Sequence, residues 1–151
     1  MDGIRIRPAA PADIGALVAL LRQLFDLETD FRPDEARQRK GLALMLGEPE
    51  RRAVLVAAVN GLVVGMVTAQ LVVSTAEGGM SALVEDMVVD APSRGHGAGA
   101  ELLRAIEAWA RERGATRLQL LADRENAPAL AFYARMGWSS TRLACLRRGG
   151  A

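Results

Sequence analysis

The stretch LVEDMVVDAPSRGHGAG, residues 83–99, predicts a strand, a glycine-rich loop and the beginning of a helix, in that order. Residues 83–89 form a short, mainly apolar run, and a strongly helical stretch begins at Ala98. Between them, residues 95–99 hold three glycines, which leave backbone N–H groups exposed at a helix N-terminus. Arg94 adds a cation beside these groups. The segment therefore predicts a binding site for a phosphorylated cofactor, and a diphosphate would use both features.

Around this segment, the pattern of polar and apolar residues predicts further strands and helices. Asn60-Gly61, between two valine-rich runs, is a strong signal for a two-residue hairpin. The expected strands cover residues 4–7, 53–59, 62–73, 81–89, 117–121 and 138–147, and the expected helices cover residues 14–25, 33–46, 98–113 and 126–136. The order βααβββαβαβ predicts an α+β fold, in which helices flank a mixed, mostly antiparallel sheet.

The composition restricts the class of protein. The 151 residues, half of them hydrophobic, predict one domain that spans residues 1–151. Nineteen basic and eighteen acidic residues leave a net charge of +1, so no global field favours nucleic acid or an anionic membrane. The single cysteine, Cys145, is expected in the core as a small apolar residue. Because the sequence opens without a signal-type segment and holds no run of membrane-spanning length, we expect a cytoplasmic protein.

Two other kinds of phosphate site have related sequences. Residues 95–100 satisfy the G-x-G-x-x-A pattern of dinucleotide sites, and Asp123 follows the next expected strand. In such folds the first glycine directly follows the strand, whereas here residues 90–94 intervene. A Walker-type loop is excluded because no Gly-Lys-Ser/Thr follows. NAD is therefore the alternative cofactor, although the glycines do not lie where a dinucleotide site requires them.

Two further segments accompany the glycine loop: VEDMVVD at residues 84–90, and NAPALAFY at residues 126–133 followed by MGW at 136–138. Together the three closely resemble the Gcn5-related N-acetyltransferase (GNAT) family. Its acyl-CoA motif, Q/R-x-x-G-x-G/A, is filled by Arg94, Gly97 and Gly99. Its later signature, N-x-x-A-x-x-F-Y-x-x-x-G-F/W, is filled by Asn126, Ala129, Phe132, Tyr133, Gly137 and Trp138. The resemblance implies an acetyl-CoA-dependent N-acetyltransferase that transfers directly in a ternary complex, without a metal.

The resemblance also implies how acetyl-CoA is bound. In this family the fourth and fifth strands splay apart, and the pantetheine arm bonds to the backbone of the fourth strand as an added strand would. A backbone amide near Val88 would polarise the thioester carbonyl. The implied cofactor-binding residues are Met87, Val88, Val89, Arg94, Gly95, His96, Gly97, Ala98, Gly99 and Asn126.

Three residues carry the implied chemistry. The family role of Tyr133 is that of a general acid, which gives its proton to the departing thiolate. The attacking amine must lose a proton, and Glu85 and Asp86 are the candidate bases, directly or through a water molecule. Side chains alternate along a strand, so at most one of the two points into the cleft unless a bulge intervenes. The sequence leaves the choice between them open.

The acceptor is predicted only as an amine. Glu28 and Asp30 lie between the first two helices, where this fold commonly lines the acceptor site. With Glu77 they would make an acidic entrance that favours a cationic amine. A small-molecule amine and a protein amine are both open, and so is a homodimer, which is common in the family. The competing class is a non-catalytic CoA-binding or sensing module, and O-acetyl transfer is a lesser alternative.

Overall fold

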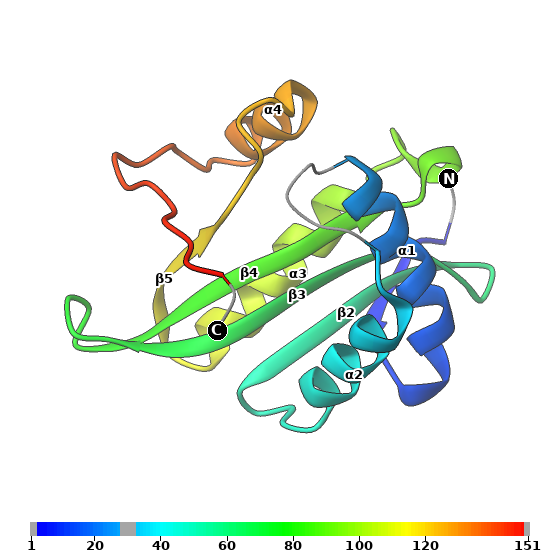
Figure 1. The fold of residues 1–151 in the computed structure, drawn as a ribbon, viewed down its shortest axis with the longest axis horizontal. Helices are drawn as coiled ribbons and strands as arrows, with labels where there is room; N and C mark the ends of the chain where they lie inside the picture. Colours follow the sequence, from blue (N-terminus) through cyan, green and yellow to red (C-terminus); the bar gives the residue numbers. More distant parts are fainter. Residues whose placement is uncertain (1–2, 28–32, 150–151) are drawn as a thin grey trace. The chain divides into compact units, whose positions relative to one another are not determined.

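The computed structural model describes residues 3–27 and 33–149. The chain divides into two compact units, residues 1–120 and 121–151. The first unit contains one sheet, whose strands are β1 (Arg5–Pro8), β2 (Arg52–Val59), β3 (Leu62–Ser74), β4 (Gly79–Val89) and β5 (Ala115–Leu120). The strands lie side by side in the order of the sequence (Figure 1). The first four are antiparallel and β5 is parallel to β4, which confirms the predicted mixed, mostly antiparallel sheet.

Helices cover both faces of this sheet. α1 (Ile14–Leu27) follows a short 3-10 turn, η1 (Pro11–Asp13), and packs with α2 (Glu35–Leu46) on one face. α3 (Ala98–Glu112), which follows the 3-10 turn η2 (Ala91–Ser93), packs on the other face (Figure 1). The observed bounds lie within about two or three residues of those predicted, as expected for helix ends.

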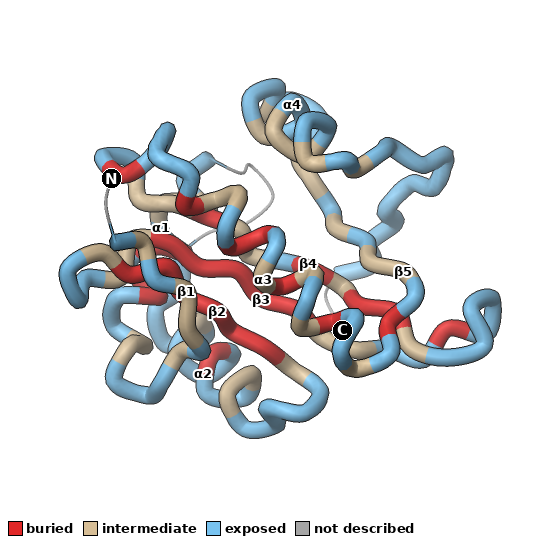
Figure 2. The backbone as a smooth tube through the Cα atoms, turned by 180° about the vertical axis from the view of Figure 1, so that it is seen from behind, coloured by how far each residue is buried: buried red, intermediate tan, exposed pale blue. Residues whose placement is uncertain are grey.

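The core lies on both faces of the central strands. Leu17 of α1 packs in one cluster with Val56 of β2 and Met66 of β3, and all three are fully buried. On the opposite face, Leu102 and Ile106 of α3 are also fully buried. In Figure 2 the buried residues, coloured red, run along the central strands of the first unit. Each such side chain contributes about 1.5–3 kcal/mol to folding, so these strands fix the frame that carries the site.

Local signals account for several element ends. Asn60 and Gly61 both have positive φ angles, 51° and 79°, as a type I′ hairpin turn requires. Asp34 caps α2, because its side chain accepts a hydrogen bond of 3.1 Å from the backbone N–H of Arg37. Gly47 ends the same helix. These residues place the helix and the hairpin where the sequence predicted them.

The second unit contains α4 (Ala127–Arg135) and no strand in residues 136–149. The predicted strand over residues 138–147 is therefore wrong. Leu143 and Leu146 are 82% and 93% exposed, and Cys145 is exposed rather than in the core. Residues 143–146 are apolar without interruption, so no alternation selects one buried face. A strand also requires a hydrogen-bonded neighbour, which local composition does not specify.

Candidate active site

The glycine loop has the geometry that an anion site requires. Gly97 is the N-cap of α3 with φ of 92°, and Gly95 has φ of 81°. Positive φ angles are easily adopted only by glycine, so these two positions shape the turn that exposes backbone N–H groups ahead of α3. Residues 94–97 are exposed to solvent. The donor set fits a diphosphate, which needs several N–H groups at a helix N-terminus.

Two side chains brace this loop. Arg94 donates a hydrogen bond of 2.9 Å from Nε to the backbone carbonyl of Val89, at the end of β4. His96 lies with Nδ1 3.4 Å from the carbonyl oxygen of Ser93. The arginine thus joins the loop to the strand, and the histidine contacts the loop's own backbone.

β4 has an open edge next to the loop. Its pairing with β5 ends at Val84 and Leu120, and within the described residues no strand pairs with Glu85–Val89 on that side. The backbone N–H of Asp90 donates to Val64 of β3, so by alternation the backbone groups of Met87 and Val89 face the open edge. The backbone of Val88, by the same rule, faces β3. The outward amides nearest Val88 are therefore those of Met87 and Val89.

A β-bulge interrupts β4 at Asp86. Glu85 pairs with Thr68 and Val88 pairs with Met66, so three steps on β4 match two steps on β3. Asp86 is the extra residue, and its φ of 50° lies in the left-handed region that aspartate tolerates better than most residues. The bulge that would allow both carboxylates on one face is present.

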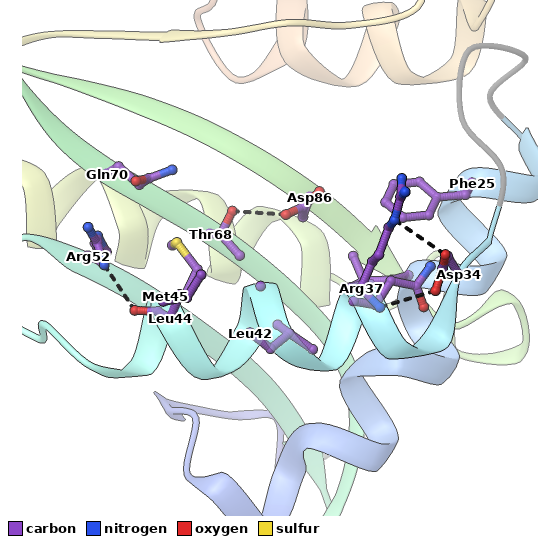
Figure 3. A pocket seen from close by; sticks show the side chains of 13 residues that line it. Phe25, Asp34, Arg37, Leu42, Leu44, Met45, Arg52, Thr68, Gln70 and Asp86 are labelled. Atoms are coloured by element: carbon purple, nitrogen blue, oxygen red, sulfur yellow. Dashed lines mark hydrogen bonds and ion pairs between the residues drawn. The ribbon is translucent and has the colours of Figure 1, made fainter. Parts of the chain in front are cut away.

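Asp86 lines a pocket of about 590 Å³ on the face of the sheet that α1 and α2 cover (Figure 3). Its apolar wall comes from Leu21, Phe25, Leu42, Leu44 and Met45. Its polar lining comes from Asp34, Arg37, Gln38, Arg52, Thr68, Gln70 and Asp86. The pocket therefore offers charges of both signs to a ligand.

Asp86 is held by a buried neighbour. The hydroxyl of Thr68, which is only 3% exposed, lies 3.3 Å from Oδ2 of Asp86 and 3.1 Å from the carbonyl oxygen of Glu85. A single hydroxyl proton serves one of these acceptors at a time. Thr68 thus positions the bulge from the opposite strand. Glu85 shares the face of Thr68 by pairing, yet it is exposed and does not line the pocket.

The predicted residues of the second unit lie on α4. Asn126 is its N-cap, with Oδ1 accepting a hydrogen bond of 3.2 Å from the N–H of Ala129. Tyr133, near the end of the helix, packs edge-on against Phe132 with ring centroids 5.4 Å apart. Its ring lies 6.3 Å from that of Trp138. The family signature thus forms a capped helix that ends in an aromatic cluster.

Of the three residues predicted to form an acidic entrance, the structure describes only Glu77. Glu28 and Asp30 lie outside the described residues. Glu77 accepts a hydrogen bond of 2.8 Å from Thr116 and pairs with Arg117 at 3.7 Å, so it binds at the start of β5 and does not line the pocket.

Sequence reasoning missed Thr68, Gln70 and Arg52. Thr68 and Gln70 are the only polar residues inside an otherwise apolar run, residues 62–73, and they stand two apart on one strand. That spacing was a usable signal, because two polar residues on one face of a buried strand indicate a polar site. Arg52 gave no such signal, because its place opposite Gln70 follows only from strand pairing.

No helix in residues 3–27 or 33–149 is long and apolar enough to cross a membrane. Within the same ranges, no group of three His, Cys, Asp or Glu side chains is placed to hold a metal ion.

The chain is similar to known acetyltransferases in sequence and in fold. A model of the acetyltransferase (GNAT) family matches residues 19–138. An aminoalkylphosphonate N-acetyltransferase from Salmonella typhimurium is 29% identical over 141 residues, which cover 93% of this chain and 88% of that protein. The chain is also similar to the solved structure of an Agrobacterium tumefaciens protein that is provisionally assigned as an acetyltransferase, with 26% sequence identity and a TM-score of 0.82. The match covers 97% of this chain and 100% of that chain.

One solved structure of similar fold contains acetyl-CoA. A Clostridium acetobutylicum protein, predicted to be an acetyltransferase and solved with acetyl-CoA, has a TM-score of 0.79 at 20% identity, with 97% of this chain and 96% of that chain covered. At this identity the likeness shows the fold alone. The family model, by contrast, covers most of the sequence, including the glycine loop and α4. This chain therefore belongs to the GNAT family of acetyltransferases and is an acyltransferase.

Proposed function

We propose that the protein transfers an acetyl group from acetyl-CoA to a primary amine by direct attack in a ternary complex. The observation that carries this proposal is the bulge at Asp86, which directs a carboxylate into a pocket while the adjacent residues of β4 keep an open edge. A pocket for an acceptor and an edge for an acyl carrier thus meet on one strand. That arrangement suits a reaction of two bound substrates.

Different residues bind the different parts of acetyl-CoA. The N–H groups of residues 95–99 hold the pyrophosphate at the N-terminus of α3. The outward backbone of Met87 and Val89 hydrogen-bonds to the pantetheine arm, and Asn126 contacts the CoA chain. Because Arg94 already bonds to the carbonyl of Val89, the N–H of Val89 is the group that this residue offers. Backbone donors dominate, so side-chain identity matters little at these positions.

Asp86 and Tyr133 move the protons. Asp86 accepts a proton from the ammonium form of the acceptor, because a protonated amine has no lone pair with which to attack. The outward N–H of Met87, which leaves its carbonyl oxygen for the pantetheine arm, polarises the thioester carbonyl while the C–N bond forms and the C–S bond breaks. Tyr133 donates its proton to the departing sulfur, and the second proton that the nitrogen loses as the amide forms restores the phenol by way of solvent. Glu85, exposed beside the pocket, is the alternative base through a water molecule.

Both units belong to one acetyltransferase domain in this proposal. The family match runs from residue 19 to residue 138 and so includes β4 of the first unit and α4 of the second. The activity named for the Salmonella relative supports nitrogen rather than oxygen as the acceptor atom. The retention of Tyr133, Glu85 and Asp86 together favours an enzyme over a CoA-sensing module that has lost its acceptor chemistry.

Thermal unfolding with added ligands tests the cofactor directly. A ligand that prefers the folded state raises Tm by mass action, with about 2.7 kcal/mol of stabilisation at one hundred times its Kd. We expect acetyl-CoA to raise Tm and NAD to leave it unchanged, followed by amine-dependent release of free thiol. A rise with NAD alone would overturn the proposal. A rise with acetyl-CoA but no turnover of any amine would favour the sensing module.

A further inference from the structure

A row of polar side chains crosses the floor of the pocket from Asp86 to Arg52. Thr68 and Gln70 occupy alternate positions of β3, so they share the pocket face, and both line the pocket. Arg52 pairs with Gln70 from β2, and Thr68 contacts Asp86 from the other side. The row therefore begins at a carboxylate, passes a hydroxyl and an amide, and ends at a guanidinium (Figure 3).

The guanidinium of Arg52 is held in place. Nη1 donates a hydrogen bond of 3.0 Å to the carbonyl oxygen of Leu44, near the end of α2. Its side chain is 33% exposed, so solvent screens it less than a fully exposed charge. Nη2 of Arg52 also forms an ion pair with Oε2 of Glu48 at 3.9 Å, which is longer than a hydrogen bond, and the Glu48 side chain is 54% exposed. Arg52 is thus a fixed cation with N–H groups that neither contact uses.

The other pocket arginine has different surroundings. The side chain of Arg37 is 89% exposed, and its Nε lies 3.5 Å from Oδ2 of Asp34. Each arginine has a carboxylate neighbour, but the much greater exposure of Arg37 to water weakens the attraction that it exerts on a ligand. The lining of the pocket also includes Gln38, whose Nε2 is buried without a hydrogen-bond partner among the described residues. A ligand with several acceptor oxygens matches this lining.

We infer that the acceptor is an amine that carries an anionic group, a carboxylate or a phosphonate, several bonds away from its nitrogen. The nitrogen lies at Asp86 and the anion at Arg52, assisted by the amide of Gln70. Arg52 and Asp86 are separated by two strand spacings across the sheet and by about two residues along the strands. Their Cα atoms therefore lie roughly 12 Å apart. The long arginine side chain spans part of that distance, and the ligand spans the remainder. This inference rests on the proposed function, which it extends to the acceptor.

A series of acceptors of matched length tests the inference. We would compare kcat/KM for glycine, 4-aminobutanoate, 3-aminopropylphosphonate, butylamine and 1,4-diaminobutane at saturating acetyl-CoA. We expect one of the two longer anionic amines to exceed butylamine at least tenfold, because hydrogen bonds to a charged group contribute about 1.5–3 kcal/mol, or roughly 10- to 100-fold. Glycine should be poorer than the longer compounds. The better of the two anions identifies the preferred headgroup.

Substitution of Arg52 provides the second arm. Arg52→Gln should reduce the preference for the anionic amine over butylamine at least tenfold, and Arg52→Glu should favour the diamine instead. If Arg52→Gln fails to fold, Arg52→Lys is measured in its place. Because lysine keeps the charge, this variant should retain a preference for the anion. Arg39→Gln is the matched control, since Arg39 lies on α2, pairs with Glu35 and does not line the pocket. It should keep the preference of the unmodified protein.

The outcomes separate the two proposals. Equal turnover of butylamine and both anionic amines, or a preference for the diamine, would overturn the acceptor inference and leave the transferase function intact. Absence of any acetyl-CoA effect on Tm and of any turnover would overturn the function itself. If acetyl-CoA binds without turnover, calorimetry of 4-aminobutanoate and 3-aminopropylphosphonate with the unmodified protein and Arg52→Gln decides the matter. Binding weakened at least tenfold by the substitution supports the inference, and equal or undetectable binding overturns it.

Discussion

At the scale of single residues, Asp86 combines a chemical and a conformational requirement. Its carboxylate faces the pocket, and its φ of 50° belongs to the left-handed region. Aspartate and asparagine adopt that region more readily than other non-glycine residues, for which it costs about 1–2 kcal/mol. The same residue can therefore carry the charge and form the bulge. These two contributions are separable by substitution.

The prediction for Asp86 uses two variants. Asp86→Asn should keep the fold and lower kcat by about 100- to 10,000-fold, the range of general base catalysis, because it keeps the backbone preference and removes the charge. Asp86→Ala should lose the same activity and also about 1–2 kcal/mol of stability. Steady-state kinetics and urea unfolding measure the two effects. A Glu85→Gln variant that loses more activity than Asp86→Asn would assign the base to Glu85.

At the scale of elements, β3 and α3 pack closely together at Gly65. A Cβ placed there would lie 3.0 Å from Cδ1 of Leu102 and 3.2 Å from the carbonyl oxygen of Val88. Leu102 is fully buried, and a backbone oxygen has little freedom to move. The absence of a side chain at this position therefore sets the spacing between the sheet and the helix that begins at the glycine loop.

We predict that Gly65→Ala destabilises the protein by about 1–3 kcal/mol, because the added methyl group overpacks the interface between β3 and α3. Gly15→Ala is the matched control, since Gly15 lies in α1 and a Cβ added there would have nothing within 4 Å. That control should stabilise the protein by about 0.5–1 kcal/mol through helix propensity. Urea unfolding measures both signs. Equal effects of the two substitutions would contradict the packing argument.

An ion pair joins β1 to the turn before α1. Two nitrogens of Arg7 donate to the carboxylate of Asp13 at 2.8 and 3.0 Å, and the N–H of Ala10 donates to the same group at 2.7 Å. The hydrogen bonds from Arg7 are the main cause that lowers the pKa of Asp13, and burial opposes them. Only 12% of the Asp13 side chain is exposed. This contact therefore stabilises the charged carboxylate in the folded state.

The expected pH dependence follows from that direction. A lowered folded pKa gives stability that is complete above the unfolded pKa of about 3.9 and is lost as the pH falls through the folded pKa. We predict that Asp13→Asn loses about 1–2 kcal/mol at pH 7, and that the difference from the unmodified protein shrinks below about pH 4. Unfolding free energies measured from pH 7 to pH 2.5 give the result. A difference that is constant over this range would contradict the assignment.

At the scale of the whole molecule, the candidate chemistry is distributed over both units. The glycine loop, the open edge of β4 and the pocket belong to the first unit, and Tyr133 belongs to the second. We predict that Tyr133→Phe impairs turnover while the Tm rise with acetyl-CoA stays within about 1 °C of that of the unmodified protein, because the phosphate and pantetheine contacts involve other residues. Kinetics and thermal unfolding of the same preparation test this. Loss of acetyl-CoA binding would instead assign a structural role to the phenol.

The sequence predicted well those features that depend on near neighbours. The hairpin at Asn60-Gly61 was predicted because its residues select backbone angles locally, and the second helix was predicted within about two residues of its observed start, although not with Asp34 as its cap. The start of α3 at Ala98 follows from the glycines before it. The last strand failed for the opposite reason, because residues 138–147 could form a strand only with a partner that the local pattern does not provide.

The candidate site divides in the same way. The sequence by itself determined the glycine loop, the helix that follows it and a pair of carboxylates at residues 85 and 86, since period and turn chemistry are properties of a few consecutive residues. Only the tertiary structure decided that the bulge directs Asp86 into the pocket, and that Arg52, Gln70 and Thr68 join it from two other strands. Strand pairing between distant segments sets the register, and register determines which side chains share a face.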